Sequence, residues 1–365
     1  MDGGLSERLP GAIAHINRIG TAVPPNDVHQ AFIDFASTLL PERSQRLFAR
    51  MAERAGIRHR FSHLRPDPAR GPSLDDTNFY RRGSFPTTAE RMRAYEAQAT
   101  GLALRAVEAL GIEPDEITHL IVASCTGFSA PGLDQLIARE LGLSPHIERT
   151  LIGFMGCYAA VPALRAARHI IRSEPAARVL VINLELCTLH LQETSDLETV
   201  LSFLLFGDAA AAALVTGETS GIALEGFRAS NLPGTGELIT WRIGDQGFDM
   251  HLSGKVPPTI AAALRTERAR NDGGGLLQGR SAADIVHWAV HAGGRTVLDA
   301  VEQGFALGSD ALAHSRAVLH EIGNVSSATL PFVLARLLAG GKKGPGMAMA
   351  FGPGLSAETF RFSLV

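Results

Sequence analysis

The sequence predicts an α/β protein whose strands are covered by helices on both faces. Three short segments are apolar along almost their whole length, at residues 117–124, 178–184 and 209–215. Apolar runs without alternating polar residues are typical of strands buried on both faces. Amphipathic patterns at residues 133–141 and 158–172 separate the first two runs, so helices are expected to link these strands.

A second set of elements follows a turn-rich segment, NLPGTG, at residues 231–236. The pattern beyond it predicts helices over residues 281–301 and 330–338, and two terminal strands over residues 346–351 and 358–365. The chain therefore repeats its mixture of helices and strands after the turn-rich segment.

This turn-rich segment, with a second set of helices and strands after it, predicts a domain boundary near residue 220. A chain of 365 residues allows two or three domains at about 100–200 residues each. The predicted halves are residues 1–220 and residues 221–365.

Composition and charge exclude several protein classes. Hydrophobic residues make up 45% of the chain, too many for a disordered protein. Lys and Arg number 34 against 37 Asp and Glu, so the net charge of −3 offers no basic excess for nucleic acid. The most apolar window, residues 202–215, is too short to span a membrane. We expect neither nucleic acid nor a membrane span.

The three cysteines predict a reducing compartment. Cys125, Cys157 and Cys187 are too few and too widely spaced for a disulfide framework or a CxxC zinc site. The first residues show no basic stretch followed by an apolar one, so no signal peptide is expected. A cytoplasmic location is the resulting prediction. Phosphate-loop, GxGxxG and HExxH motifs are also absent, so no metal is expected.

Cys157 is the candidate nucleophile. It lies in GFMGCYAA, residues 153–160, directly before an alanine-rich helical pattern. A thiol at a helix N-terminus meets the positive end of the helix dipole, which stabilises the thiolate. The alternative is a buried cysteine that acts as a small apolar side chain.

His291 is the candidate proton acceptor for that thiol. A nucleophilic cysteine needs a neighbouring base, and His291 lies in WAVHAGG, residues 288–294. A histidine hydrogen-bonded inside a helix is the alternative. His287, four residues earlier, would share a helix face with it and compete for the role.

Asn324 is the third candidate, in GNVSSAT at residues 323–329. The pattern predicts a strand-to-helix turn, at which an asparagine commonly caps the helix. The functional alternative is an amide that donates a hydrogen bond to a developing oxyanion.

Together these segments resemble the chalcone synthase-like type III polyketide synthases of the thiolase superfamily. The Cys, His and Asn segments occur in the family's order, together with GTAVPPN at residues 20–26, LFGDAAA at 205–211 and AFGPGLS at 350–356. The resemblance spans almost the whole chain and its SCTGF segment, residues 124–128, is similar to the bacterial members.

The resemblance implies a five-layer αβαβα thiolase-like fold with two pseudo-equivalent halves, in a homodimer. It implies that Cys157 accepts an acyl group from an acyl-CoA starter. His291 and Asn324 would hold malonyl-CoA and stabilise the enolate left by decarboxylation. Repeated condensation and cyclisation would yield an aromatic or pyrone product of the alkylresorcinol, alkylpyrone, tetrahydroxynaphthalene or phloroglucinol type. Coenzyme A thioesters are substrates, and no cofactor is implied.

The resemblance also assigns the cavity. Phe206 matches the family's gatekeeper aromatic, and Met250 stands where plant enzymes carry a second phenylalanine. Cys125, Cys187 and His190 replace threonines of the plant cavity, Trp241 replaces a small residue, and Ser326 is assigned to the same wall. These differences argue against chalcone as the product.

Coenzyme A is expected to meet basic residues on RLFARMAER, residues 46–54. Arg50 and Arg54 match family positions on one helix face, and Arg46 compensates for a family lysine that is Leu47 here. A solvated arginine face is the alternative. Gly293 and Gly294 are assigned to the same binding site.

Three other functions stay open from the sequence. A ketoacyl-acyl-carrier-protein synthase of the fatty-acid initiating type also uses Cys, His and Asn, but its His segment reads HQAN rather than HAGG. A papain-like protease matches the spacing of Cys157 and His291 but not the sequence around the cysteine. A non-catalytic acyl-CoA-binding relative would keep the fold without turnover.

Overall fold

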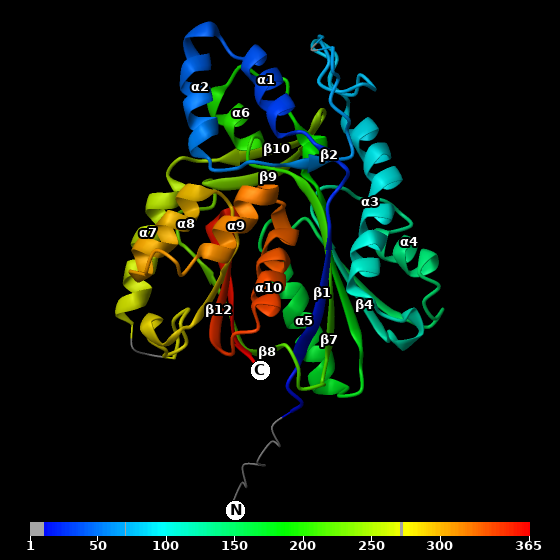
Figure 1. Ribbon diagram of the computed structural model, residues 1–365, viewed down its shortest axis with the longest axis vertical. Helices are drawn as coiled ribbons and strands as arrows, with labels where there is room; N and C mark the ends of the chain where they lie inside the picture. The colour runs from blue at the N-terminus through cyan, green and yellow to red at the C-terminus, as the bar shows by residue number, and fades with distance from the viewer. Residues whose placement is uncertain (1–10, 70, 271–272) are drawn as a thin grey trace, which may run out of the picture.

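Nine strands pair in one mixed sheet, in the order β11-β12-β13-β8-β1-β7-β6-β4-β5 (Figure 1). The computed structural model describes residues 11–69, 71–270 and 273–365. The strands of this sheet are β1 (His15–Ala22), β4 (His119–Ser124), β5 (Glu148–Gly153), β6 (Val179–Leu186), β7 (Asp208–Thr216), β8 (Ile222–Asn231), β11 (His287–Val290), β12 (Gly344–Gly352) and β13 (Ser356–Leu364).

The pairing pattern repeats, which confirms the two pseudo-equivalent halves. In the first half β4 is parallel to β6, which is antiparallel to β7, which is antiparallel to β1. In the second half β11, β12, β13 and β8 repeat this order of directions. The halves join where β1 pairs with β8 at two residue pairs only. The predicted boundary near residue 220 falls in the connection between β7 and β8.

Alternating side chains show how helices cover both faces. In β4, Leu120 and Val122 pack with α3, whereas Ile121 and Ala123 pack in the core of α5 and α10. α5 and α10 lie centrally, with α3 and α4 on one flank and α7 and α8 on the other, as the five-layer prediction requires (Figure 1). The helices of these layers are α3 (Thr88–Leu110), α4 (Leu133–Glu140), α5 (Ala160–Ser173), α7 (Val256–Ala269), α8 (Arg295–Phe305), α9 (Ala313–Ile322) and α10 (Thr329–Gly340).

A smaller group of elements forms a cap over one end of the layers (Figure 1). β4 and β6 both end beneath this cap, so the loops that follow them can contribute to a site there. The cap contains α1 (His29–Leu39), α2 (Glu42–Arg54), α6 (Leu197–Phe203), the β9 (Ile239–Gly244) and β10 (Gly247–Leu252) hairpin, and the short pair β2 (Asn26–Asp27) and β3 (Phe61–Ser62).

The strands predicted from apolar runs are all present, but the helix predicted over residues 281–301 is wrong. That range holds β11 and only the first half of α8. Trp288 and Val290 pack with α8, whereas Ala289 packs on the opposite face of the strand. Because β11 is buried on both faces, it lacks the alternation of polar residues that marks a strand, and its apolar residues match a helical spacing equally well.

The same strand removes His287 from the site. His287 opens β11 and His291 follows its end. Four residues of extended chain span about 13 Å, so the two imidazoles are not neighbours on a helix face. The prediction that His287 competes with His291 is wrong.

Within residues 11–69, 71–270 and 273–365, none of the helices combines the length and the apolar character needed to cross a bilayer. The prediction about a signal peptide concerns residues outside this described part.

Candidate active site

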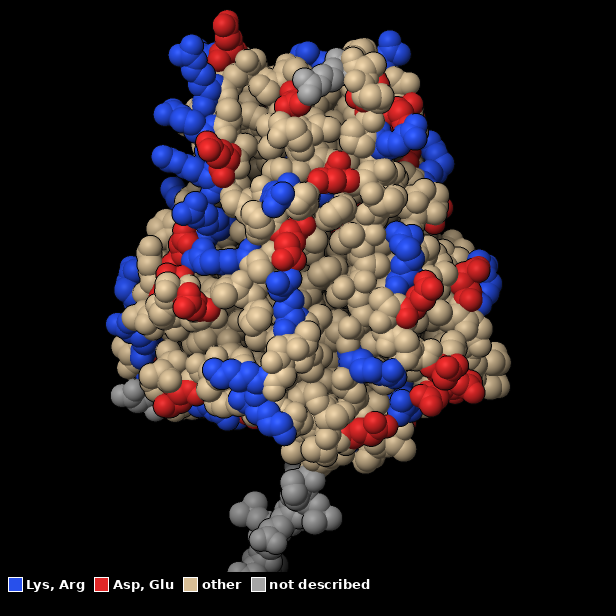
Figure 2. All heavy atoms as spheres, viewed as in Figure 1, with Lys and Arg blue, Asp and Glu red and all other residues tan. Residues whose placement is uncertain are grey.

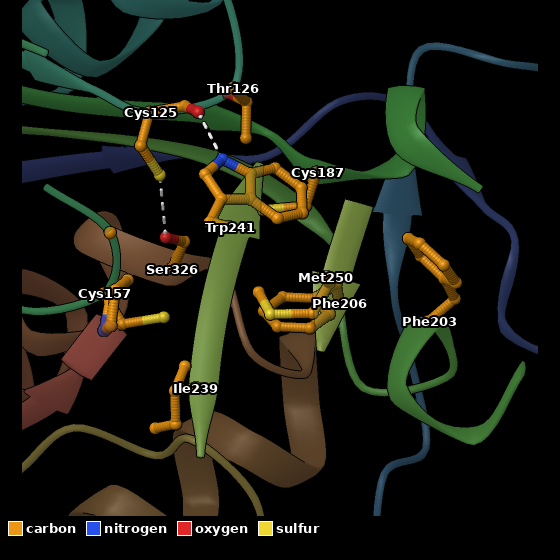
Figure 3. A pocket seen from close by; sticks show the side chains of 12 residues that line it. Cys125, Thr126, Cys157, Cys187, Phe203, Phe206, Ile239, Trp241, Met250 and Ser326 are labelled. Carbon is orange, nitrogen blue, oxygen red and sulfur yellow. Dashed lines mark hydrogen bonds between the residues drawn. The ribbon is translucent and has the colours of Figure 1, made fainter. Parts of the chain in front are cut away.

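A pocket lies beneath the cap (Figure 3). It is bordered by both halves of the sheet and by the cap hairpin, so residues distant in sequence meet here. Its lining residues are Cys125, Thr126, Gly156, Cys157, Cys187, Phe203, Phe206, Ile239, Trp241, Met250, Ser326 and Pro353. Seven of the predicted site residues are among them.

Cys157 enters the pocket from the turn between β5 and α5. Its side chain is half-buried and points into the cavity (Figure 3). Gly156 has φ +78°, and a Cβ there would come within 2.5 Å of Pro353. Glycine is therefore required for the tight turn that holds Cys157 against the loop around Pro353.

The environment of Cys157 keeps the thiol protonated. Burial raises its pKa to about 11, against the opposing effect of hydrogen bonds from Ser326 and Asn324. The helix dipole of α5 does not overcome this burial, so the expected resting thiolate is not favoured. A base must remove the proton when the nucleophile is used.

Asn324 follows the helix α9 rather than a strand, so the predicted strand-to-helix turn is wrong. Its side chain is nevertheless fixed in orientation. Its Oδ1 accepts a hydrogen bond from the backbone N–H of Ser326 at 2.9 Å, and its Nδ2 donates to the carbonyl of Gly293 at 3.2 Å. The amide N–H group therefore faces Gly293 and Cys157, as a donor to bound substrate must.

His291 lies two residues before Gly293, whose carbonyl accepts from this amide, and one residue beyond the end of β11. Its backbone N–H donates to the carbonyl of Met349 at 2.8 Å, which continues the pairing with β12. Burial lowers the pKa of the imidazole to about 3, so the ring is neutral. In the part of the chain that the structure describes, neither ring nitrogen has a hydrogen-bond partner.

An unpartnered buried imidazole lowers the stability of the fold. A Cβ on Gly293 would lie 3.4 Å from His291 Nε2, so the segment that Asn324 contacts also borders the histidine. Asn324 thus lies beside Cys157 and beside the segment that carries His291, although neither Asn324 nor His291 borders the empty space of the pocket.

Phe206, the predicted gatekeeper, is tied to Asn324 through the backbone. The two residues form a parallel bridge, and the N–H of Gly207 donates to the carbonyl of Asn324 at 3.0 Å. Arg60 donates to the carbonyls of Phe203 and Phe206 at 3.0 and 3.1 Å. Burial lowers the pKa of this guanidinium to about 9. Sequence analysis missed Arg60 because its partners lie 143 and 146 positions away.

Trp241 narrows the far side of the pocket. It stands opposite Met250 in the β9–β10 hairpin, and its Nε1 donates to the carbonyl of Cys125 at 2.9 Å (Figure 3). His190 lies behind it, stacked on Phe248 with centroids 4.2 Å apart. Its Nε2 donates to the carbonyl of Thr126 and its Nδ1 accepts from Phe248 N–H. The His190 imidazole is thus neutral and is held by Thr126 and Phe248, and it does not border the empty space of the pocket.

Glu185 is a buried carboxylate that sequence analysis missed. It accepts from the backbone N–H of Cys125 at 3.0 Å and from the hydroxyls of Thr126 and Ser327 at 2.9 and 2.5 Å. Burial raises its pKa, and these donors offset the cost of burying it. The sequence signal that could have identified Glu185 was a single acidic residue within the apolar run of β6.

Cys125 donates from Sγ to Glu185 at 3.2 Å and lies 3.3 Å from the hydroxyl of Ser326. Burial and the neighbouring carboxylate hold its pKa well above the usual range. Cys125 is therefore a cavity wall and a poor second nucleophile.

The arginines of α2 project from the surface of the cap. Phe48 and Ala52 pack α2 onto α6, which leaves Arg46, Arg50 and Arg54 exposed. Lys and Arg side chains project along this edge of the molecule (Figure 2). Gly293 and Gly294 lie immediately before α8. Their assignment to coenzyme A stays a prediction, as does that of the arginines.

Comparisons with known proteins agree along the whole chain. Residues 6–219 match the family model for chalcone and stilbene synthases, N-terminal domain, and residues 227–365 match the C-terminal domain of that family. Among the most similar relatives is the alpha-pyrone synthesis polyketide synthase-like Pks18 of Mycobacterium tuberculosis, 31% identical over 98% of this chain and 92% of its own length.

Solved structures of similar fold give the same result. PKS-I of the brown alga Ectocarpus siliculosus has a TM-score of 0.84 and 28% identity, over 98% of this chain and all of its own. The tetrahydroxynaphthalene synthase of Streptomyces coelicolor, a bacterial type III polyketide synthase, has a TM-score of 0.83 and 26% identity, over 96% of this chain and 99% of its own.

Proposed function

The chain belongs to the chalcone and stilbene synthase family and is a type III polyketide synthase, and we propose that it builds its product on Cys157. The observation that carries this proposal is the contact of Asn324 both with Cys157, in the pocket, and with Gly293, two residues after an unpartnered, neutral His291. The single-condensation ketoacyl synthase is not favoured.

Loading transfers the starter acyl group to Cys157. His291 takes the thiol proton as the sulfur attacks the thioester carbonyl of the acyl-CoA, a carbon–sulfur bond forms, and coenzyme A leaves as its thiolate. The neutral imidazole has a lone pair for this proton, and the negative charge that develops as the thiol is deprotonated and coenzyme A leaves favours the imidazolium that forms. The proton then remains on His291.

Extension uses the same groups as donors. When the carboxylate of malonyl-CoA leaves as carbon dioxide, its bonding electrons pass to the thioester carbonyl and create an enolate oxygen. His291 and the Nδ2 of Asn324 donate to that oxygen. Fixed donors in a site that excludes water stabilise such charge at little reorganisation cost. The enolate carbon then attacks the acyl group, and the Cys157 thiolate leaves.

The pocket suggests which products to expect. The relative Pks18 is named for alpha-pyrone synthesis, and a pyrone or aromatic ring closed from a short polyketide is the proposed product here. Phe206, Met250 and Trp241 limit the length of chain that fits.

Replacing Trp241 with glycine should lengthen the product. The indole occupies the far side of the pocket, and its loss opens space for further extension units or longer starters. A pocket discriminates by about 1–3 kcal/mol per methylene, so the distribution should move to larger masses by liquid chromatography and mass spectrometry. Ile243→Ala, a 61% exposed residue of the same strand, is the control. An unchanged distribution in Trp241→Gly would contradict this limit.

Removing the side chain of Arg50 or Arg54 should weaken the binding of coenzyme A substrates. A hydrogen bond to a charged group contributes about 1.5–3 kcal/mol, so each Ala variant should raise KM for acyl-CoA by about tenfold or more with kcat little changed. A short acyl thioester without the nucleotide should show no change. Arg139→Ala, an exposed arginine of α4, is the control. Equal KM values for wild type and both variants would remove α2 from this role.

We further propose that two copies associate along β5. This strand is one of the two edge strands of the sheet, with β11 at the other end, and Leu151 and Phe128 expose apolar surface beside it. An exposed edge strand is an unstable arrangement unless it is covered. Sedimentation analysis should give twice the mass of the chain.

The cytoplasmic location expected from the free cysteines also remains a prediction.

Product analysis tests the proposed function directly. Malonyl-CoA is supplied alone and with short, aromatic and long-chain acyl-CoA starters, and products and intact protein are measured by mass spectrometry. A polyketide together with an acyl adduct on Cys157 is expected. Folded protein that yields neither from any starter would contradict the proposal and point to carrier-protein substrates.

A further inference from the structure

A histidine and two glutamates meet at the end of the sheet opposite the pocket. His119 begins β4, Glu148 begins β5, and Glu174 follows α5. The His119 Nε2 atom lies 3.7 Å from Oε2 of Glu148 and 4.0 Å from Oε2 of Glu174. One ligand atom from each residue falls within 4.8 Å of the others. We call these three residues the edge cluster.

The Thr118 hydroxyl lies beside the other ring nitrogen of His119. It accepts the N–H of Arg178 at 2.9 Å, and it lies 3.2 Å from the carbonyl of Arg178 and 2.8 Å from His119 Nδ1. When Nδ1 donates to this hydroxyl, Nε2 presents a lone pair to the two carboxylates.

The imidazole cannot turn away from this arrangement, because His119 is only 5% exposed. The Nε2 atom and the two carboxylates therefore stay within reach of one cation, which would offset the repulsion between the two carboxylates.

Neighbouring arginines do not neutralise the edge cluster. Arg178 pairs with Glu116 and Glu218 at 2.9 and 2.7 Å. Arg149 pairs with Asp134 at 3.0 Å. Both guanidinium groups are thus engaged by other carboxylates.

We propose that the edge cluster binds one Zn²⁺ ion, with a water as the fourth ligand. Imidazole nitrogen and carboxylate oxygen are zinc ligands at about 2.0–2.2 Å, and a protonated Nδ1 held by an outer hydroxyl is the usual support for a ligating histidine. The glutamate side chains are 75% and 59% exposed, so they are free to close on the ion. The zinc would tie the edge strand β5 and the end of α5 to β4, far from the catalytic pocket.

Zinc titration of the full chain tests the proposal. After treatment with a chelator and its removal, calorimetry should show one equivalent of Zn²⁺ bound. Zinc at a hundred times its Kd should raise Tm by about 3–5 °C. Glu148→Gln and Glu174→Gln should each weaken binding by about tenfold or more, and His119→Gln should abolish it.

All these variants keep the three cysteines, so loss of zinc binding cannot be attributed to thiols. Glu113→Gln, an exposed glutamate near the same end of the sheet, is the matched control and should bind zinc as the wild type does. Absence of zinc binding, or equal binding by wild type and the Glu148→Gln/Glu174→Gln double variant, would overturn the proposal.

Discussion

Cys157→Ala is expected to abolish polyketide formation while malonyl-CoA decarboxylation continues at a reduced rate. Loss of the thiol removes the only group in the pocket that is proposed to carry the growing chain. Asn324 remains in place without its hydrogen bond to Cys157, because Ser326 and Gly293 also anchor it, and the His291 side chain makes no hydrogen bond that the substitution removes. Donors to the enolate oxygen are therefore still present. Separate measurements of carbon dioxide release and of product by mass spectrometry check this.

Cys125→Ser provides the contrast to this variant. Cys125 is buried, bonded to Glu185 and held as a neutral thiol, so serine should replace it with the acyl adduct on Cys157 retained. If the adduct is lost from Cys125→Ser and kept in Cys157→Ala, the assignment of the nucleophile is wrong.

Apolar composition and segment length explain both the strands that the sequence predicted correctly and the strand that it missed. Strands such as β4, β6 and β7 are apolar on both faces and bounded by helices, so local composition identifies them. β11 is equally apolar but has only four residues, and its flanking histidines at positions 287 and 291 match a helical repeat. A segment too short to show a period cannot be assigned from its period.

The residues of the site also fall into two groups: those that the sequence predicted and those that it did not. The nucleophile, the histidine and the asparagine each occur in a local motif, and resemblance to a family was enough to select them. Glu185 and Arg60 have no such motif. Glu185 joins Thr126 to Ser327, 59 and 142 positions away. Contacts over such separations arise from the sheet order, which composition and spacing do not encode.

Asn324→Asp should lower decarboxylation by about 10²–10³-fold, or about 3–4 kcal/mol in the barrier. The aspartate keeps an oxygen to accept from the Ser326 N–H, so the turn into α10 should survive. It replaces the N–H donor by an acceptor that repels the enolate oxygen. Initial rates of carbon dioxide release, measured with an unchanged Tm, check the loss. A rate equal to that of the wild type would remove Asn324 from the chemistry.

His291→Gln should separate the two halves of the reaction, because the two halves need different properties of the imidazole. A glutamine amide donates a hydrogen bond but does not accept a proton at neutral pH. Decarboxylation should therefore fall less in His291→Gln than in His291→Ala, whereas loading of Cys157 should be lost in both. Intact-protein mass spectrometry measures loading and carbon dioxide release measures decarboxylation. Loading at the wild-type rate in His291→Gln would mean that the proton of the Cys157 thiol, whose pKa burial raises to about 11, leaves by another route.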